Sequence, residues 1–325
     1  MGVSPVGPTG SGRSRWRTAA VAVAVLTFFG IALAARWHDV TARKWELDPG
    51  YLALATLVLA VSYAMVAALW AAALRRAAGL ALPRGMRIWF ASNLARYVPG
   101  NVWSFVGAVE LARREDVPRR TTLAVMTLAQ LLSVGTALLI GLPVLVAGKV
   151  RVGPAVALGG LAVALAAVLG VALRHRIAAL LRRRYPEVGA RELAPSPRVA
   201  AALAAGYGLY WVVTGLAFAG LIRSLRPLAA SEVPLAVAAY AAAYAIGFLA
   251  LFTPAGLGVR EGVLTVVLVQ IMPAGAALAV ALLSRLWMML VELLGAGLMQ
   301  LLDRGRAASQ PVADPNGPGS RSTPG

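Results

Sequence analysis

The sequence Phe252-Thr-Pro-Ala-Gly-Leu-Gly-Val-Arg-Glu-Gly262 interrupts a long apolar stretch. Pro254 lacks a backbone N–H and disfavours a helical residue before it, and the glycines loosen the backbone further. Arg260 and Glu261 then place two charges where hydrocarbon is expected. Non-helical backbone at membrane depth is stable only when it is buried in protein or lines a wet cavity, and charge there is generally functional. The stretch therefore predicts a membrane protein folded around a polar cavity.

A second interruption, Arg96-Tyr-Val-Pro-Gly-Asn-Val-Trp103, lies within the apolar residues 80–111. Basic clusters stand at both ends of that stretch, which places both ends on the same side of the membrane. The stretch therefore predicts a re-entrant hairpin with its tip at Pro99 and Gly100. Counting crossings along the chain, the interruption near Pro254 should enter the membrane from the opposite side.

The composition is that of a membrane protein. The chain has 325 residues, of which 59% are hydrophobic, and its mean hydropathy is +0.75. The net charge is +18, but the basic residues stand mainly between apolar runs, which is typical of topology signals and lipid contact rather than of a nucleic-acid surface. With no Cys and only His38 and His175, we expect no metal and no cofactor.

Hydropathy and loop charge predict an all-α polytopic membrane protein with about six full-length transmembrane helices and two broken or re-entrant helix pairs. The predicted full-length helices are residues 18–35, 51–74, 121–147, 153–173, 199–222 and 276–302. Residues 174–198 hold seven arginines and are the clearest cytoplasmic loop. This pattern predicts a cytoplasmic-membrane protein with both termini in the cytoplasm.

The predicted domain organisation is simple. Residues 1–16 and 303–325 are rich in Gly, Pro and Ser and are expected to be disordered, and residues 17–302 form one transmembrane domain. A shift of 155 residues superimposes the two interruptions and brings residues 121–147 onto 276–302. Residues 51–147 and 199–302 are therefore candidate units of an inverted repeat, whose paired interruptions mark a central binding site in many transporters. Chance similarity within an Ala/Leu-rich chain is the alternative.

Six charges are expected at membrane depth. They are Arg96, Glu110, Arg260, Glu261, Arg285 and Glu292. In one interpretation Arg96 and Arg260 bind a lipid phosphate through their planar guanidinium groups, with Glu261 and Glu292 organising them. In the other, the six charges pair with one another and only stabilise the fold.

Polar and aromatic residues also recur at helical spacing. These stripes are Thr127, Gln130 and Ser133; Tyr207, Tyr210, Trp211 and Thr214; and Tyr240, Tyr244 and Phe248. Helix packing and interface anchoring are the leading explanation for such stripes, although some members could line the cavity.

Taken together, the two interruptions resemble the transmembrane, flippase-like domain of lysylphosphatidylglycerol synthases, over residues 17–302. In bifunctional members that domain moves an aminoacylated phospholipid between leaflets, and a separate soluble domain makes the lipid. Stand-alone relatives are tied to other lipids, including polyprenyl-linked sugars and hopanoids. Residues 303–325 are too short for an aminoacyl-transfer domain, so the resemblance implies a lipid transporter and not an enzyme. The residues that it carries over are Arg96, Tyr97, Pro99, Gly100, Asn101, Trp103, Pro254, Gly256, Gly258, Arg260, Glu261 and Gly262.

The leading hypothesis is a protein that moves an anionic or polyprenyl-linked lipid head group between leaflets. The expected substrate-binding residues are Arg96, Tyr97, Asn101, Trp103, Arg260, Glu261, Arg285 and Glu292. The expected structural breaks are Pro99, Gly100, Pro254, Gly256, Gly258 and Gly262. The alternatives are an integral-membrane enzyme acting on lipid phosphates, and a scaffold that recruits a lipid-synthesising enzyme through residues 174–198. The expected partners are membrane lipids.

Overall fold

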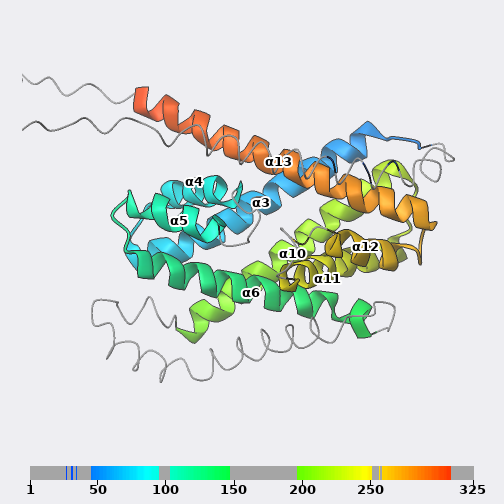
Figure 1. Ribbon diagram of the computed structural model, residues 1–325, viewed down its shortest axis with the longest axis horizontal. Coiled ribbons are helices and arrows are strands. Elements are labelled where there is room, and N and C mark those ends of the chain that lie inside the picture. The colour runs from blue at the N-terminus through cyan, green and yellow to red at the C-terminus, as the bar shows by residue number, and fades with distance from the viewer. Residues whose placement is uncertain are drawn as a thin grey trace, which may run out of the picture.

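The computed structural model describes residues 45–94, 103–146, 196–250, 256 and 258–308, with three isolated positions before residue 45. The regular elements in this part of the chain are all helices (Figure 1). Five of them are long and apolar enough to cross a membrane: Pro49–Ala78, Arg119–Leu145, Pro197–Leu225, Ala230–Leu249 and Ala274–Leu302. The predicted all-α polytopic membrane fold is therefore confirmed.

The first group of helices is a long helix, a short pair and a second long helix. They are α3 (Pro49–Ala78), α4 (Leu82–Asn93), α5 (Trp103–Arg113) and α6 (Arg119–Val146). α3 begins where the Asp48 carboxylate accepts hydrogen bonds from the backbone N–H groups of Gly50 and Tyr51, at 2.8 and 3.1 Å. It ends at Gly79, whose φ of 73° turns the chain into α4.

The second group repeats this order. It comprises α10 (Pro197–Leu225), a single 3-10 turn η2 (Ala230–Glu232), α11 (Val233–Leu249), α12 (Val259–Leu268) and α13 (Ala274–Ala308). The shift of 155 residues carries Arg119, where α6 begins, onto Ala274, where α13 begins. The short pair α4 and α5 lies toward one end of the bundle, and α11 and α12 lie toward the other (Figure 1). This placement suits hairpins that enter from opposite faces, but the inverted relation of the units stays a prediction.

Four of the six predicted full-length helices are confirmed as α3, α6, α10 and α13. α13 continues to Ala308, beyond the predicted helix end at residue 302, and residues 309–325 lie outside the described residues. Residues 153–173 lie outside the described residues, and only isolated positions of 18–35 are described.

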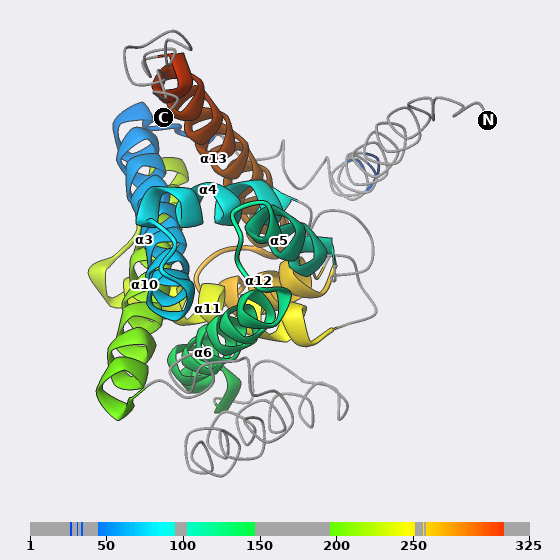
Figure 2. The same ribbon diagram turned by 90° about the vertical axis from the view of Figure 1, so that its left-hand side faces the viewer.

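The centre of the fold is α11, which packs against α6, α10 and α12 (Figure 2). It is rich in alanine, and ten of its residues are buried. Small residues let neighbouring backbones approach it closely, since a Cβ atom on Gly141 of α6 would lie 2.8 Å from backbone atoms of Ala242. Close backbone approach of this kind is how helices associate in lipid, where apolar burial gives little driving force.

Gly141→Ala is therefore expected to destabilise the α6–α11 contact by about 1–3 kcal/mol, because the added methyl group meets rigid backbone. The measurement is thermal unfolding of the purified protein in detergent. Gly135→Ala is the matched control on the same helix, because nothing lies within 4 Å of the added Cβ. Equal melting temperatures for the two variants would contradict the packing argument.

Candidate functional site

The interruption between α11 and α12 depends on two glycines in the left-handed region. Gly256 has φ +71° and Gly258 has φ +82°. Gly256 lies directly on the backbone of Gly247, because a Cβ atom on Gly256 would be 2.8 Å from the Gly247 carbonyl oxygen. Gly262 lies within α12 and not at the break, and Pro254 lies outside the described residues.

Glu261 holds the beginning of α12. Its Oε2 accepts a hydrogen bond from the backbone N–H of Gly258 at 2.7 Å, which satisfies a donor that the start of the helix leaves open. Its Oε1 lies 3.7 Å from Nη1 of Arg285 on α13. The carboxylate therefore joins the break to the last long helix.

Four charged side chains on α12 and α13 are buried: Arg260 is 7% exposed, Glu261 3%, Arg285 3% and Glu292 1%. Two of the four are cationic and two anionic, so the group is formally neutral. Buried charge is stable only when it is paired and hydrogen-bonded.

Arg260 reaches away from the break toward α11. Its guanidinium carbon lies 4.7 Å from the ring centroid of Tyr240 and 5.9 Å from that of Tyr244. These aromatic faces stabilise the cation without neutralising it. Gly247 gives the arginine room to pass, because a Cβ atom there would lie 3.2 Å from the Arg260 Cβ.

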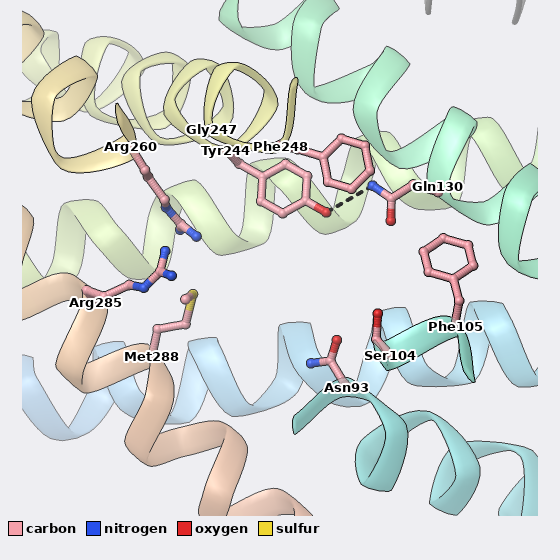
Figure 3. Close-up of a pocket in the computed structure, with 10 residues that line it drawn as sticks. All are labelled: Asn93, Ser104, Phe105, Gln130, Tyr244, Gly247, Phe248, Arg260, Arg285 and Met288. Atoms are coloured by element: carbon pink, nitrogen blue, oxygen red, sulfur yellow. Dashed lines mark hydrogen bonds between the residues drawn. The ribbon is translucent and has the colours of Figure 1, made fainter. Parts of the chain in front are cut away.

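Arg260 and Arg285 both line a cavity of about 100 Å³. Figure 3 shows their guanidinium groups pointing toward the same space, opposite Asn93, Ser104 and Phe105. The described lining is Asn93, Ser104, Phe105, Gln130, Tyr244, Gly247, Phe248, Arg260, Arg285 and Met288. The cavity is thus bounded by the ends of α4 and α5 on one side and by α11 and α12 on the other, and its described lining carries two positive charges and no carboxylate.

A second cavity of about 100 Å³ adjoins the first and shares Asn93, Ser104, Phe105, Gln130 and Tyr244 with it. The rest of its described lining is Tyr63, Val66, Trp70, Trp89, Ser92, Met126, Ala129, Ser133, Tyr207 and Tyr210. None of these side chains is charged. Together the two adjoining cavities present a cationic end and an aromatic end that carries amide and hydroxyl groups.

The sequence-predicted site residues fall into three groups. Arg260 and Arg285 line the cavity, while Glu261 and Glu292 are buried but are not among the lining residues. Trp103 begins α5 and is 45% exposed, and the lining includes its neighbours Ser104 and Phe105 instead. The residues Arg96, Tyr97, Pro99, Gly100 and Asn101 lie outside the described residues.

Glu110 does not join the buried charges. It lies near the end of α5, which is not one of the five candidate spans, and its carboxylate accepts hydrogen bonds from Arg113 Nη2 at 2.9 Å and Nε at 3.2 Å. The hydrogen bond from Arg113 holds the pKa of Glu110 below its ordinary value. This carboxylate is therefore part of a surface ion-pair group.

Sequence reasoning did not single out Asn93 and Ser104, and it named Gln130 only as a member of a polar stripe some of whose members could line the cavity. Gln130 Nε2 donates a hydrogen bond to the Tyr244 hydroxyl at 3.2 Å across the cavity wall (Figure 3). Their position in the sequence could have indicated a place in the cavity, because Asn93 and Ser104 are polar residues that flank the first interruption.

Glu261→Ala is expected to lower the free energy of unfolding by about 3–5 kcal/mol, because it removes one member of a buried ion pair together with the acceptor at the start of α12. Glu261→Gln keeps an oxygen that can accept from Gly258 and loses only the charge, so it should fall between Ala and the native chain. Melting temperatures in detergent test this order. An Ala variant as stable as the native protein would show that the carboxylate does not hold the break.

Comparison with known proteins gives one family match. The model of the lysylphosphatidylglycerol synthase TM region matches residues 17–295. Among curated proteins and among solved structures, none matches the sequence significantly.

Proposed function

The chain belongs to the lysylphosphatidylglycerol synthase transmembrane family, an integral-membrane family related to lipid metabolism, and we propose that it moves a phosphate-bearing lipid between leaflets. In this proposal the head group crosses through the cavity while the acyl or prenyl tails stay in the bilayer. No chemical step is assigned to the chain.

The observation that carries the proposal is the convergence of the Arg260 and Arg285 guanidinium groups on one buried cavity. The buried carboxylates of Glu261 and Glu292 balance the two arginines in sum, but they are not among the described lining residues, so an anion in the cavity would meet guanidinium groups. A phosphodiester matches this arrangement because guanidinium groups bind phosphate oxygens through two parallel charge-assisted hydrogen bonds.

The aromatic end of the space supports a head group that continues beyond the phosphate. Its rings offer flat apolar faces, and Asn93, Gln130 and Ser104 offer hydrogen-bonding groups. An uncharged polyhydroxylated group, such as a sugar or an inositol ring, suits such a surface. A second anionic group has no described cationic partner there.

Lipid movement in proteoliposomes tests the proposal. Acyl-labelled phosphatidylglycerol, phosphatidylinositol and a phosphate-free glucosylceramide are placed in both leaflets, and an impermeant reductant then reports how much label becomes accessible. The expected result is that the native protein exposes the inner-leaflet label of both phospholipids and not that of the glycolipid. Exposure of phosphatidylinositol faster than phosphatidylglycerol would support the role of the aromatic end.

If no phospholipid moves, with or without a proton gradient, transport is rejected. Thin-layer chromatography of the lipids from the same vesicles then separates the two alternatives. An altered lipid indicates an integral-membrane enzyme, and unaltered lipids direct attention to the scaffold.

A further inference from the structure

A groove separate from the central space lies between α4, the end of α5 and the second half of α13. Its described lining is Arg84, Arg87, Ile88, Ala91, Leu111, Arg114, Glu115, Ala296, Met299 and Gln300, and its volume is about 220 Å³. None of these residues lines either of the two central cavities. Figure 2 shows α4, α5 and the α13 helix that crosses them at the end of the bundle facing the viewer.

The groove has an apolar floor and a cationic rim. Ile88 and Ala296 are buried, at 6% and 4% exposure, and form part of the floor with Leu111 and Met299. The rim holds three arginines against the single carboxylate of Glu115.

Among the described residues of the rim, the arginines outnumber the carboxylates even where ion pairs form. Glu115 is shared by two arginines, with its Oε2 3.2 Å from Arg84 Nη1 and its Oε1 3.9 Å from Arg87 Nη2. Arg114 lies 3.9 Å from Glu110, whose shorter contact of 2.9 Å is with Arg113. The four arginines and two glutamates of this group leave an excess of two positive charges.

We infer that this groove binds an anionic phospholipid of the bilayer, with the phosphate at Arg84 and Arg87 and the glycerol and upper acyl chains along the floor. A free phosphate would make no contact with this apolar floor, whereas the glycerol and upper acyl chains of a lipid would cover it. The arginines belong to the clusters that the positive-inside rule places in the cytoplasm, where anionic lipids give the leaflet a negative surface.

The site is tested by the affinity of the full chain for phosphatidylglycerol. Native mass spectrometry in detergent counts phosphatidylglycerol and phosphatidylcholine bound per protein as each lipid is titrated. Each Lys or Arg at an anionic lipid surface is worth roughly fivefold in binding, so Arg84→Gln/Arg87→Gln should weaken the tightest phosphatidylglycerol site on the order of tenfold or more. Phosphatidylcholine binding should change little.

Arg75→Gln/Arg76→Gln is the matched control, because it removes the same charge from two exposed arginines at the end of α3, outside the groove. Ala91→Phe is the second variant, because it fills the groove from an exposed position without changing the charge. Loss of affinity in the groove variants and not in the control supports the site. Equal affinity in all variants, or equal loss in both double variants, overturns it. Neither outcome depends on whether the protein moves lipid.

Discussion

Arg260→Gln is expected to reduce lipid movement on the order of 10- to 100-fold, because a charge-assisted hydrogen bond to the head-group phosphate is lost at the centre of the cavity. The arginine is 7% exposed and is held over the ring of Tyr240, so its guanidinium is already oriented toward the ligand. A glutamine keeps a polar group there, but it is shorter and supplies no charge. The measurement is the rate of label exposure for phosphatidylglycerol in proteoliposomes.

Arg223→Gln is the matched control for this variant. Arg223 also lies over an aromatic ring, with its guanidinium carbon 4.7 Å from the centroid of Tyr51, but it is exposed and outside the cavity. Its substitution should leave the rate of label exposure within about twofold of the native value, because the side chain does not line the cavity. Surface substitutions also usually change stability by 0.5 kcal/mol or less, so the protein should stay folded. Arg260→Lys should give an intermediate rate, because lysine restores the charge but not the planar fork. Native rates in a folded Arg260→Gln protein would remove Arg260 from the transport model.

Gly256→Ala is expected to prevent correct folding of the α11–α12 break. Two costs act together at this position. The φ of +71° is strained for an alanine, and the added methyl group would lie 2.8–2.9 Å from the carbonyl oxygen, carbonyl carbon and Cα of Gly247. Backbone atoms cannot rotate away from such a clash, so α12 must separate from α11. We expect a large loss of monodisperse protein on size-exclusion chromatography and a lower melting temperature for what remains.

Gly262→Ala provides the comparison within the same short helix. Gly262 lies inside α12, and nothing lies within 4 Å of an added Cβ atom. Alanine is favoured over glycine in a helix by about 1 kcal/mol, so this variant should be as stable as the native chain or slightly more stable. If both glycine variants behave alike, the contact between Gly256 and Gly247 is not what fixes the break.

The interruption near Gly256 could be predicted from the sequence because its cause is local. Proline and glycine act on the backbone within one or two residues, and their effect does not depend on what packs nearby. Arg260 and Arg285 stood out for a related reason, since charge is rare at membrane depth whatever its neighbours are. The convergence of these two arginines on one space needed the structure, because they lie on different helices.

The uncharged part of the cavity could not be predicted in the same way. Trp211 belongs to the same aromatic stripe as Tyr207 and Tyr210, yet its Nε1 donates a hydrogen bond to the Ser133 carbonyl at 2.8 Å and it acts in helix packing. Tyr207 and Tyr210, on the same helix as Trp211, line the second cavity instead. Residue type and spacing are alike in both cases, and only the arrangement of the helices distinguishes them.

The contact between Gly256 and Gly247 also bears on how the cavity would open. Not even a methyl group fits between the two backbones. A change in the angle between α11 and α12 would therefore break this contact. We expect the two helices to move together as a rigid unit that carries Arg260. The opposite wall, formed by the ends of α4 and α5, has no such close contact at Gly107, where an added Cβ would have 3.6 Å to Ser92. If access alternates between the two faces of the membrane, the hinge belongs on the α4–α5 side.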